Sequence, residues 1–184
     1  LDLFGFGSVA NFAHLGGLIS GIIFAMIYKI IFSKVSWMIK KAVLPVAGLG
    51  TRFIPASKAT PKEMLPIIDK PLVQYAVEEA ISIGIKEIIF ITSPEKNSIK
   101  KHFNKNEEIE KRLIQSGKRE IAKKLNPEIF SDVTFFYINQ ETQNGLGDAI
   151  LHAESVVNNE DFAVLLPDDL IFSEKSCLSQ LLEI

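Results

Sequence analysis

The stretch Ala42-Val43-Leu44-Pro45-Val46-Ala47-Gly48-Leu49-Gly50-Thr51-Arg52 joins a short apolar run to a turn that contains two glycines. An apolar run that ends at glycine is typical of a central strand in a parallel sheet, buried on both faces. The glycines let the backbone turn tightly and present N–H groups to a phosphate, which a Cβ atom would keep at a distance. The stretch therefore predicts a strand over 42–47, followed by a loop that binds phosphate.

The charged residues of this loop strengthen that interpretation. Gly48-x-Gly50 alone is also what an ordinary tight turn would show, and it is neither a Walker A motif nor a complete dinucleotide fingerprint. Arg52 adds a fork of donors that suits phosphate oxygens. Lys62 lies among three prolines that stiffen the loop, so we interpret it as a functional point charge; a plain surface lysine is the alternative.

The rest of the chain alternates between strand and helix patterns. We expect strands over 87–92, 134–139 and 162–166, and helices over 71–83, 94–125 (with a turn), 146–157 and from 175 onward. This alternation predicts an α/β fold with a mostly parallel sheet and helices on both faces. Such sheets bind ligands beyond the carboxyl ends of their strands. Three polar segments follow predicted strands, at 48–62, 140–147 and 167–169, so we expect one site that uses all three.

The run from Gly48 to Pro66 resembles the signature of the nucleoside-diphosphate-sugar pyrophosphorylases. Within that family it is most similar to the bacterial enzymes that act on UTP and glucose-1-phosphate. The similarity continues through 69–75, 84–88, 144–147 and 166–168, and so covers nearly all of residues 38–184. The resemblance implies a Rossmann-like α/β/α sandwich.

The resemblance also implies roles for single residues. The nucleotide phosphates would bind at Gly48, Leu49, Gly50, Thr51 and Arg52. Lys62 and Arg52 would be the catalytic residues, because they would neutralise charge at the reacting phosphate. Gln140 and Gly145 would hold the uracil, although an exposed loop glutamine is the alternative for Gln140.

The metal implied by the resemblance is Mg²⁺, with Asp168 as its ligand. Asp169 ranks lower, because the side chains of consecutive residues diverge. Asp148 departs from the family pattern, since many relatives have histidine there. His102 and His152 lie in charged, helical contexts, and we expect both at the surface.

The implied reaction is transfer of a uridylyl group from UTP to glucose-1-phosphate, which yields UDP-glucose and pyrophosphate. The full-length family enzyme would be a homo-oligomer in the cytoplasm. A thymidylyltransferase and a UTP-binding module without turnover are the alternatives. Leu1 at the start and a helix interrupted at Ile184 indicate a fragment, for which we expect little activity alone. The net charge of −2 gives no electrostatic reason to expect a nucleic-acid partner.

The first 37 residues differ sharply in composition from the remainder. They carry a net charge of +1, whereas the whole chain carries −2, so the net charge of residues 38–184 is −3. We therefore place a domain boundary near Trp37. Residues 12–32 are long and apolar enough to predict one transmembrane helix, with a buried core helix as the alternative. Lys34, Lys40 and Lys41 place its C-terminal side in the cytoplasm, next to an inner membrane.

Residues 11–21 resemble the last core helix of rhomboid intramembrane serine proteases. In that family the matching histidine, His14 here, is the general base of a Ser/His dyad. No Gly-x-Ser-Gly motif occurs in the sequence, so His14 lacks its nucleophile. We therefore expect no proteolysis from this segment; a rhomboid-type protease with an incidental soluble tail is the alternative. The single cysteine, Cys177, excludes an internal disulfide.

Overall fold

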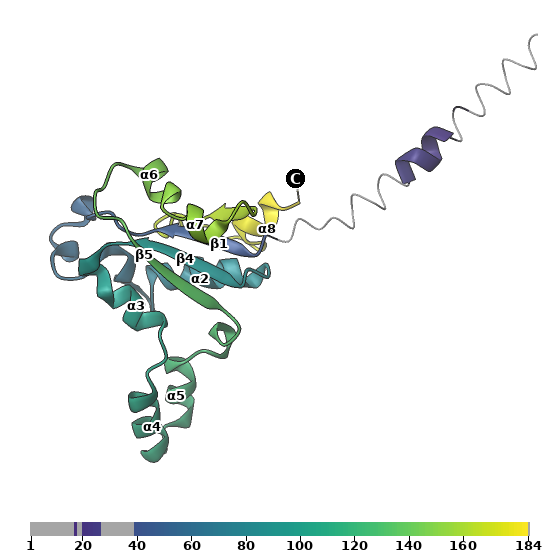
Figure 1. Ribbon diagram of the computed structural model, residues 1–184. Coiled ribbons are helices and arrows are strands. Elements are labelled where there is room, and N and C mark those ends of the chain that lie inside the picture. The colour runs from purple at the N-terminus through teal and green to yellow at the C-terminus, as the bar shows by residue number, and fades with distance from the viewer. Residues whose placement is uncertain (1–16, 18–19, 27–38, 184) are drawn as a thin grey trace, which may run out of the picture. The chain divides into compact units, whose positions relative to one another are not determined.

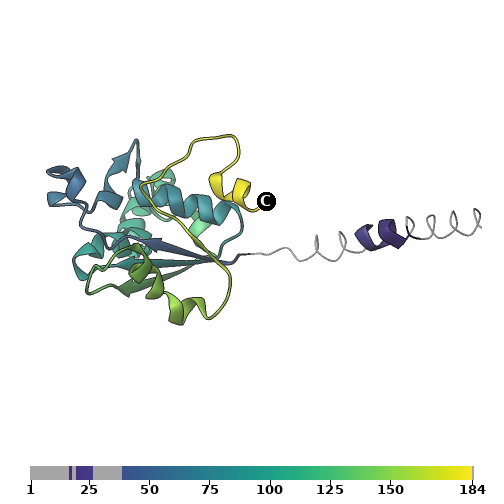
Figure 2. The ribbon, with the colours of Figure 1, turned by 90° about the horizontal axis from the view of Figure 1, so that it is seen from above.

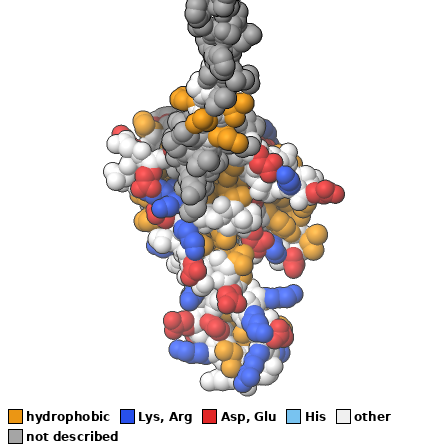
Figure 3. Space-filling model, turned by 90° about the vertical axis from the view of Figure 1, so that its right-hand side faces the viewer, with side chains coloured by type: hydrophobic (Ala, Val, Ile, Leu, Met, Phe, Trp, Pro, Cys, Tyr) orange, Lys and Arg blue, Asp and Glu red, His pale blue; other side chains and the backbone are white. Residues whose placement is uncertain are grey.

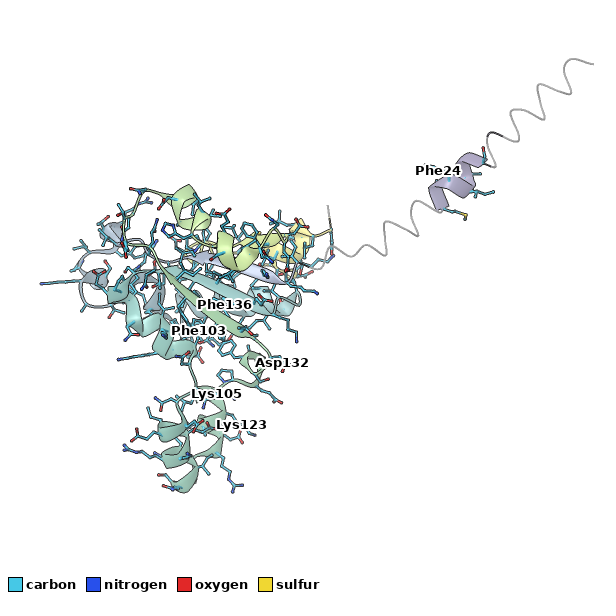
Figure 4. The ribbon with its side chains drawn as sticks, in the orientation of Figure 1. Phe24, Phe103, Lys105, Lys123, Asp132 and Phe136 are labelled. Atoms are coloured by element: carbon cyan, nitrogen blue, oxygen red, sulfur yellow. The ribbon has the colours of Figure 1, made fainter. Side chains whose placement is uncertain are left out.

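The computed structural model describes residues 17, 20–26 and 39–183. The chain divides into two units, Leu1–Trp37 and Met38–Ile184. In the first unit, residues 20–26 are helical, and the side chain of Phe24 is labelled in Figure 4. Most of the predicted membrane helix over 12–32, and His14 with it, lies outside the described residues. Within the described residues, no helix has the length and hydropathy needed to cross a membrane.

The second unit is built on a four-stranded parallel sheet. Its strands are β1 (Lys41–Pro45), β4 (Glu87–Thr92), β5 (Thr134–Asn139) and β6 (Phe162–Val164), in the order β5-β4-β1-β6. Val43 pairs with Ile89 on one side and with Val164 on the other, so β1 lies inside the sheet. This confirms the predicted α/β fold with a parallel sheet.

Helices cover both faces of this sheet, as Figures 1 and 2 show. One face packs against α2 (Leu72–Ser82), α3 (Asn97–Phe103) and α8 (Cys177–Leu181), and the other against α6 (Leu146–Leu151) and α7 (Glu154–Val157). Because successive strand residues point to opposite faces, Ile88 and Phe90 enter the first core while Ile89 and Ile91 enter the second. All four are fully buried, which is why the centre of β4 is a continuous apolar run.

The same alternation is visible in β5. Phe135 packs in the core that contains Phe103 of α3, with ring centroids 5.1 Å apart, whereas Phe136 packs against the opposite core. Figure 4 labels Phe103 and Phe136 on these two elements. Stacked aromatic rings at this distance add to the apolar burial, so the α3 side of the sheet is firmly held.

A pair of short helices projects from the body below α3 in Figure 1. They are α4 (Glu107–Gln115) and α5 (Arg119–Leu125); Asn106 caps the first by accepting a hydrogen bond from the N–H of Ile109. Charged side chains of both signs cover this part in Figure 3. The predicted region 94–125 therefore contains three helices, α3, α4 and α5, rather than two.

Two further predicted helices differ from the structure. The helix expected over 146–157 is two helices, because the N–H of Ala153 bonds to Ile150 three residues back and so makes a tighter turn between them. The last helix begins at Cys177 rather than at Lys175, because the Ser176 hydroxyl accepts from the N–H of Ser179 and caps the helix there.

The remaining short elements lie in the connections. They are a two-stranded antiparallel ribbon, β2 (Pro66–Ile67) with β3 (Lys70–Pro71), and five 3₁₀ turns: η1 (Thr51–Phe53), η2 (Ala56–Lys58), η3 (Lys62–Met64), η4 (Pro94–Lys96) and η5 (Glu128–Phe130). Three of the turns belong to the long loop between β1 and α2. Local bonds within that loop therefore hold it in shape.

His102 is not the surface residue that its charged neighbours suggested. Its side chain is half-buried and its Nε2 donates to Oε1 of Gln74 on α2, 2.8 Å away. Burial lowers the pKa of His102 below its ordinary value of 6.5, because desolvation disfavours the imidazolium. The ring is therefore neutral at neutral pH and acts as a polar link between α3 and α2.

This link predicts a loss of stability in mild acid. Below pH 6.5 the unfolded chain takes up a proton that folded His102 resists, so the free energy of unfolding falls as the pH falls. Urea unfolding at about pH 7.5 and about pH 5.5 should show a smaller acid effect in His102→Gln than in the wild type. His152→Gln is the control. Equal acid sensitivity in the wild type and His102→Gln would contradict this prediction.

Candidate active site

The polar segments that follow β1, β5 and β6 meet at the carboxyl edge of the sheet. Gln143 Nε2 donates to the carbonyl oxygen of Ala47 at 2.9 Å, which ties the segment after β5 to the segment after β1. Lys62 Nζ lies 2.7 Å from Asp168 Oδ2, which ties the loop after β1 to the segment after β6. Residues far apart in the sequence therefore share one rim.

The Lys62–Asp168 contact places two charged residues of the predicted site together. It leaves the Lys62 side chain 20% exposed and that of Asp168 39% exposed, so both remain within reach of a ligand. The hydrogen bond from Lys62 lowers the pKa of Asp168, with smaller electrostatic contributions from Lys62 and Arg52. Because this depressed pKa keeps Asp168 ionised, the ion pair persists at neutral pH and is lost only as the pH falls through the folded-state pKa.

Gly50 is held where only glycine fits well. Its φ is +64°, and a Cβ atom added there would lie 3.3 Å from Cβ and Cγ of Lys62. The carbonyl oxygen of Gly50 also accepts from Ser57 Oγ at 2.7 Å. The turn after β1 therefore packs directly against the base of the Lys62 side chain. Gly48 has no such restriction, because a Cβ atom there meets nothing within 4 Å.

This difference between the two glycines predicts different costs for adding a methyl group. We expect Gly50→Ala to lower the free energy of unfolding by about 1–2 kcal/mol, the cost of a left-handed backbone conformation for an L-residue. Gly48→Ala should change it by less than about 0.5 kcal/mol. Urea unfolding monitored by circular dichroism would measure both. The prediction is wrong if the two variants lose equal stability.

Lys96 holds the loop after β1 through buried hydrogen bonds, a role that the sequence pattern did not reveal. Only 8% of Lys96 is exposed, and its Nζ donates to the carbonyl oxygens of Val46 and Gly48 and, at 2.8 Å, to Oε2 of Glu63. Glu63 is 1% exposed and directly follows Lys62. One buried ammonium group therefore fastens the turn after β1 to the segment that carries Lys62.

Gln140 is buried rather than an exposed loop residue. It is 4% exposed, its N–H bonds to the carbonyl oxygen of Thr92 on β4, and its side-chain Nε2 donates to Asp148 Oδ2 at 2.6 Å. Gly145, the other residue predicted to hold the base, stands just before α6 with φ +107°, a conformation that favours glycine. Both predicted base-binding residues thus belong to the connection between β5 and α6.

The other predicted phosphate-binding residues are exposed. Leu49 is 67% exposed, and Thr51 and Arg52 form the exposed start of η1. Arg52 is close enough to Asp168 to help to lower the pKa of that carboxyl group. The structure therefore brings Arg52, Lys62 and Asp168 to one place, with the Gly48–Gly50 turn beside them.

A metal ion at this site would have Asp168 as its protein ligand. No group of three or more His, Cys, Asp or Glu side chains suited to a metal exists among the described residues. Mg²⁺ is commonly held by one or two carboxylates together with substrate phosphates, so an ionised Asp168 at the rim fits this ion once a nucleotide supplies further oxygens.

Residues 41–183 match the family described as Nucleotidyl transferase. The chain belongs to this family.

Among curated members, this nucleotidyl transferase chain is 50% identical over 145 residues to UTP–glucose-1-phosphate uridylyltransferase of Mycoplasma pneumoniae, covering 79% of the chain and 50% of that relative. It is 49% identical over 146 residues to the enzyme YngB of Bacillus subtilis, covering 79% of the chain and 49% of the relative. The chain thus spans about half the length of the curated relatives that it matches.

A solved structure shows the same similarity. The UTP-bound UGPase from Acinetobacter baumannii superposes with a TM-score of 0.70 at 48% identity, over 73% of this chain and 47% of that one. The Rossmann-like nucleotidyltransferase fold that the sequence predicted is therefore confirmed. None of these relatives is a rhomboid protease, and the rhomboid resemblance of residues 11–21 stays a prediction.

Proposed function

We propose that this chain binds UTP at the carboxyl edge of its sheet, as part of an enzyme that makes UDP-glucose and pyrophosphate from UTP and glucose-1-phosphate. The observation that carries the proposal is the meeting of Lys62, Arg52 and Asp168 beside the Gly48–Gly50 turn. Its support comes from the relatives, which are named for this reaction, and from the UTP-bound structure that superposes on the chain.

In the proposed reaction, a phosphate oxygen of glucose-1-phosphate attacks the α-phosphorus of UTP. A new P–O bond forms, the bond from the α-phosphorus to the bridging oxygen breaks, and pyrophosphate leaves with that oxygen. The attacking phosphate is already an anion, so the reaction needs no general base. Catalysis then depends on alignment and on positive charge near the reacting phosphorus.

Two cations of the chain would supply that charge. Arg52 offers several N–H donors in a plane, which suits two phosphate oxygens at once, and Lys62 offers a point charge. The Gly48–Thr51 backbone would add N–H groups, because a turn that contains a left-handed residue such as Gly50 can gather successive amides around an anion. Mg²⁺ held by Asp168 would neutralise phosphate charge and so aid the departure of pyrophosphate.

The uracil would occupy the connection between β5 and α6. Gln140 would contact it through the side-chain amide and Gly145 through the backbone, since they stand at the two ends of this connection. Thymine has a similar edge, so a thymidylyltransferase remains the second candidate. The relatives named above favour UTP.

Isothermal titration calorimetry with UTP and Mg²⁺ tests the nucleotide part of the proposal. We expect a Kd between about 1 μM and 1 mM, the range in which enzymes usually bind substrates. Titration with dTTP separates the two candidates, since tighter binding of dTTP would favour the second. Absence of UTP binding at about 1 mM would refute the proposal.

Release of pyrophosphate tests the transfer reaction. A uridylyltransferase releases pyrophosphate only when UTP and glucose-1-phosphate are both supplied. Release from UTP alone would indicate hydrolysis instead and would contradict the proposed acceptor. Binding of UTP without any release would correspond to a UTP-binding module without turnover.

A further inference from the structure

Asp148 is not among the site residues that the family resemblance implies, but it contacts one of them, Gln140. Its Oδ2 accepts from Nε2 of Gln140 at 2.6 Å, a short charge-assisted hydrogen bond between the connection after β5 and helix α6. The carboxylate is itself held near His152, whose Nδ1 lies 3.8 Å from Oδ2 and 2.8 Å from the backbone oxygen of Asp148. We propose that Asp148 fixes the orientation of the Gln140 amide and thereby makes the site select uracil over cytosine.

Asp148 and Gln140 differ in the hydrogen bonds that the ends of their side chains can form. A carboxylate group has acceptors only, whereas the end of a glutamine side chain has a donor nitrogen and an acceptor oxygen. Asp148 therefore requires the NH₂ group of Gln140 to face it, and turning the amide over would bring two oxygens together. No donor among the described residues bonds to Oε1 of Gln140, so that oxygen is left to accept from a ligand.

The bond to Asp148 also fixes which atoms the other side of the Gln140 amide presents. Gln140 is 4% exposed and its backbone N–H is bonded to Thr92 of β4, so its side chain cannot swing out into solvent and reorient there. The amide therefore presents an acceptor at Oε1 beside the second N–H of Nε2. A base that pairs fully with this amide must place a donor opposite Oε1 and an acceptor opposite the N–H group of Nε2.

Uracil and cytosine differ in the order of donor and acceptor along the edge that would meet this amide. Uracil has a donor at N3–H beside an acceptor at O4, which matches the fixed amide. Cytosine has an acceptor at N3 beside a donor at N4, and it matches the amide only if the amide turns over. With Asp148 present, cytosine would place acceptor against acceptor and donor against donor, and unpaired buried polar groups weaken binding strongly. Thymine has the same edge as uracil, so Asp148 does not discriminate between these two.

This inference rests on the proposed function, because it assumes that the base meets Gln140. It assigns Asp148 as a positioning residue that acts through Gln140 and does not touch the base. A positioning role of this kind changes the ratio of two affinities. A purely structural role would change both affinities together.

The test is a titration of the chain with UTP and with CTP, which share the same ribose and triphosphate, in the wild type and in Asp148→Asn. Asparagine keeps the shape of Asp148 but can accept or donate, so the Gln140 amide becomes free to turn over. We expect the preference for UTP, which is the Kd for CTP divided by the Kd for UTP, to fall about tenfold in this variant. Glu154→Gln, on the neighbouring helix α7, is the matched control for loss of a negative charge and should keep the wild-type ratio.

Two further measurements keep the outcome decisive. Asp148→Ser removes the carboxylate with a smaller side chain, so it supplies the comparison if Asp148→Asn loses its circular dichroism spectrum. The ratio of the UTP and dTTP affinities should stay constant in every variant, because thymine and uracil have the same edge.

The possible failures are distinguishable. If the wild type prefers UTP and the Asp148 variants keep that preference, the inference is overturned while the proposed function stands. Equal weakening of UTP and CTP would also overturn it, since Asp148 would then be only structural. If the wild type binds neither nucleotide, the proposed function fails and the inference fails with it.

Discussion

Replacement of Lys62 by methionine is expected to weaken UTP binding about 10- to 100-fold, the value of one hydrogen bond to a charged group. Lys62 lies at the rim against Asp168 and beside Arg52, so its loss removes a cation at the position proposed for the phosphates. Methionine keeps the length of the side chain without its charge. Isothermal titration calorimetry with UTP and Mg²⁺ would measure the change.

A second lysine of the same loop is the control. Lys58 is exposed at the end of η2, and Lys58→Met removes the same charge a few residues away. We expect that variant to bind UTP within about threefold of the wild type, because exposed charges are screened by solvent and salt. Equal weakening in both variants would show that Lys62 contributes only to the overall field. Unchanged binding in Lys62→Met would contradict its proposed role.

Folding stability separates Lys62 from a purely structural residue. Its ion pair with Asp168 is partly exposed, so we expect Lys62→Met to change the free energy of unfolding by less than about 1 kcal/mol. A large loss of UTP affinity with a small loss of stability would identify a binding residue.

Lys96 should show the opposite behaviour. We expect Lys96→Met to lower the free energy of unfolding by about 3–5 kcal/mol, the usual cost of removing one partner from a buried ion pair. The variant would leave Glu63 as a buried carboxylate without its cation, and the carbonyl oxygens of Val46 and Gly48 without their donor. Urea unfolding monitored by circular dichroism would measure the loss.

Two further variants test this explanation. Lys86→Met removes a lysine whose ion pair with Asp132 is exposed, and it should cost less than about 1 kcal/mol. Lys96→Met combined with Glu63→Gln should be more stable than Lys96→Met alone, because the uncompensated charge is gone. If Lys96→Met is no less stable than Lys86→Met, the buried pair does not hold the loop.

Local sequence patterns predicted the frame of the fold well. The strands at Glu87–Thr92 and Thr134–Asn139 begin and end where expected, because the apolar centre of each strand stands out from its polar flanks. The position of the site also followed from topology, since polar segments after parallel strands must meet at one edge. The resemblance supplied the roles expected of single residues.

Contacts between distant residues escaped prediction. Lys96 and Glu63 are 33 positions apart, and residue type alone would place each at the surface, whereas the fold buries both. His102 is similar, because its charged neighbours suggested exposure, whereas its ring is half-buried and hydrogen-bonded to Gln74 of another helix. The bond between Gln140 and Asp148 depends on how the chain turns between β5 and α6, which residue types alone do not specify.

The strand order also has a consequence for the time at which the site forms. β1 is the first of the four strands in the sequence but lies inside the sheet. One of its two neighbours, β6, is the last of the four in the sequence. Lys62 and Asp168 are consequently 106 positions apart. Contacts of such long range close slowly, so we expect β6 to dock last during refolding. Pulsed hydrogen exchange would then show amide protection in β1 and β4 before β6, and the two halves of the rim would meet only in the final step.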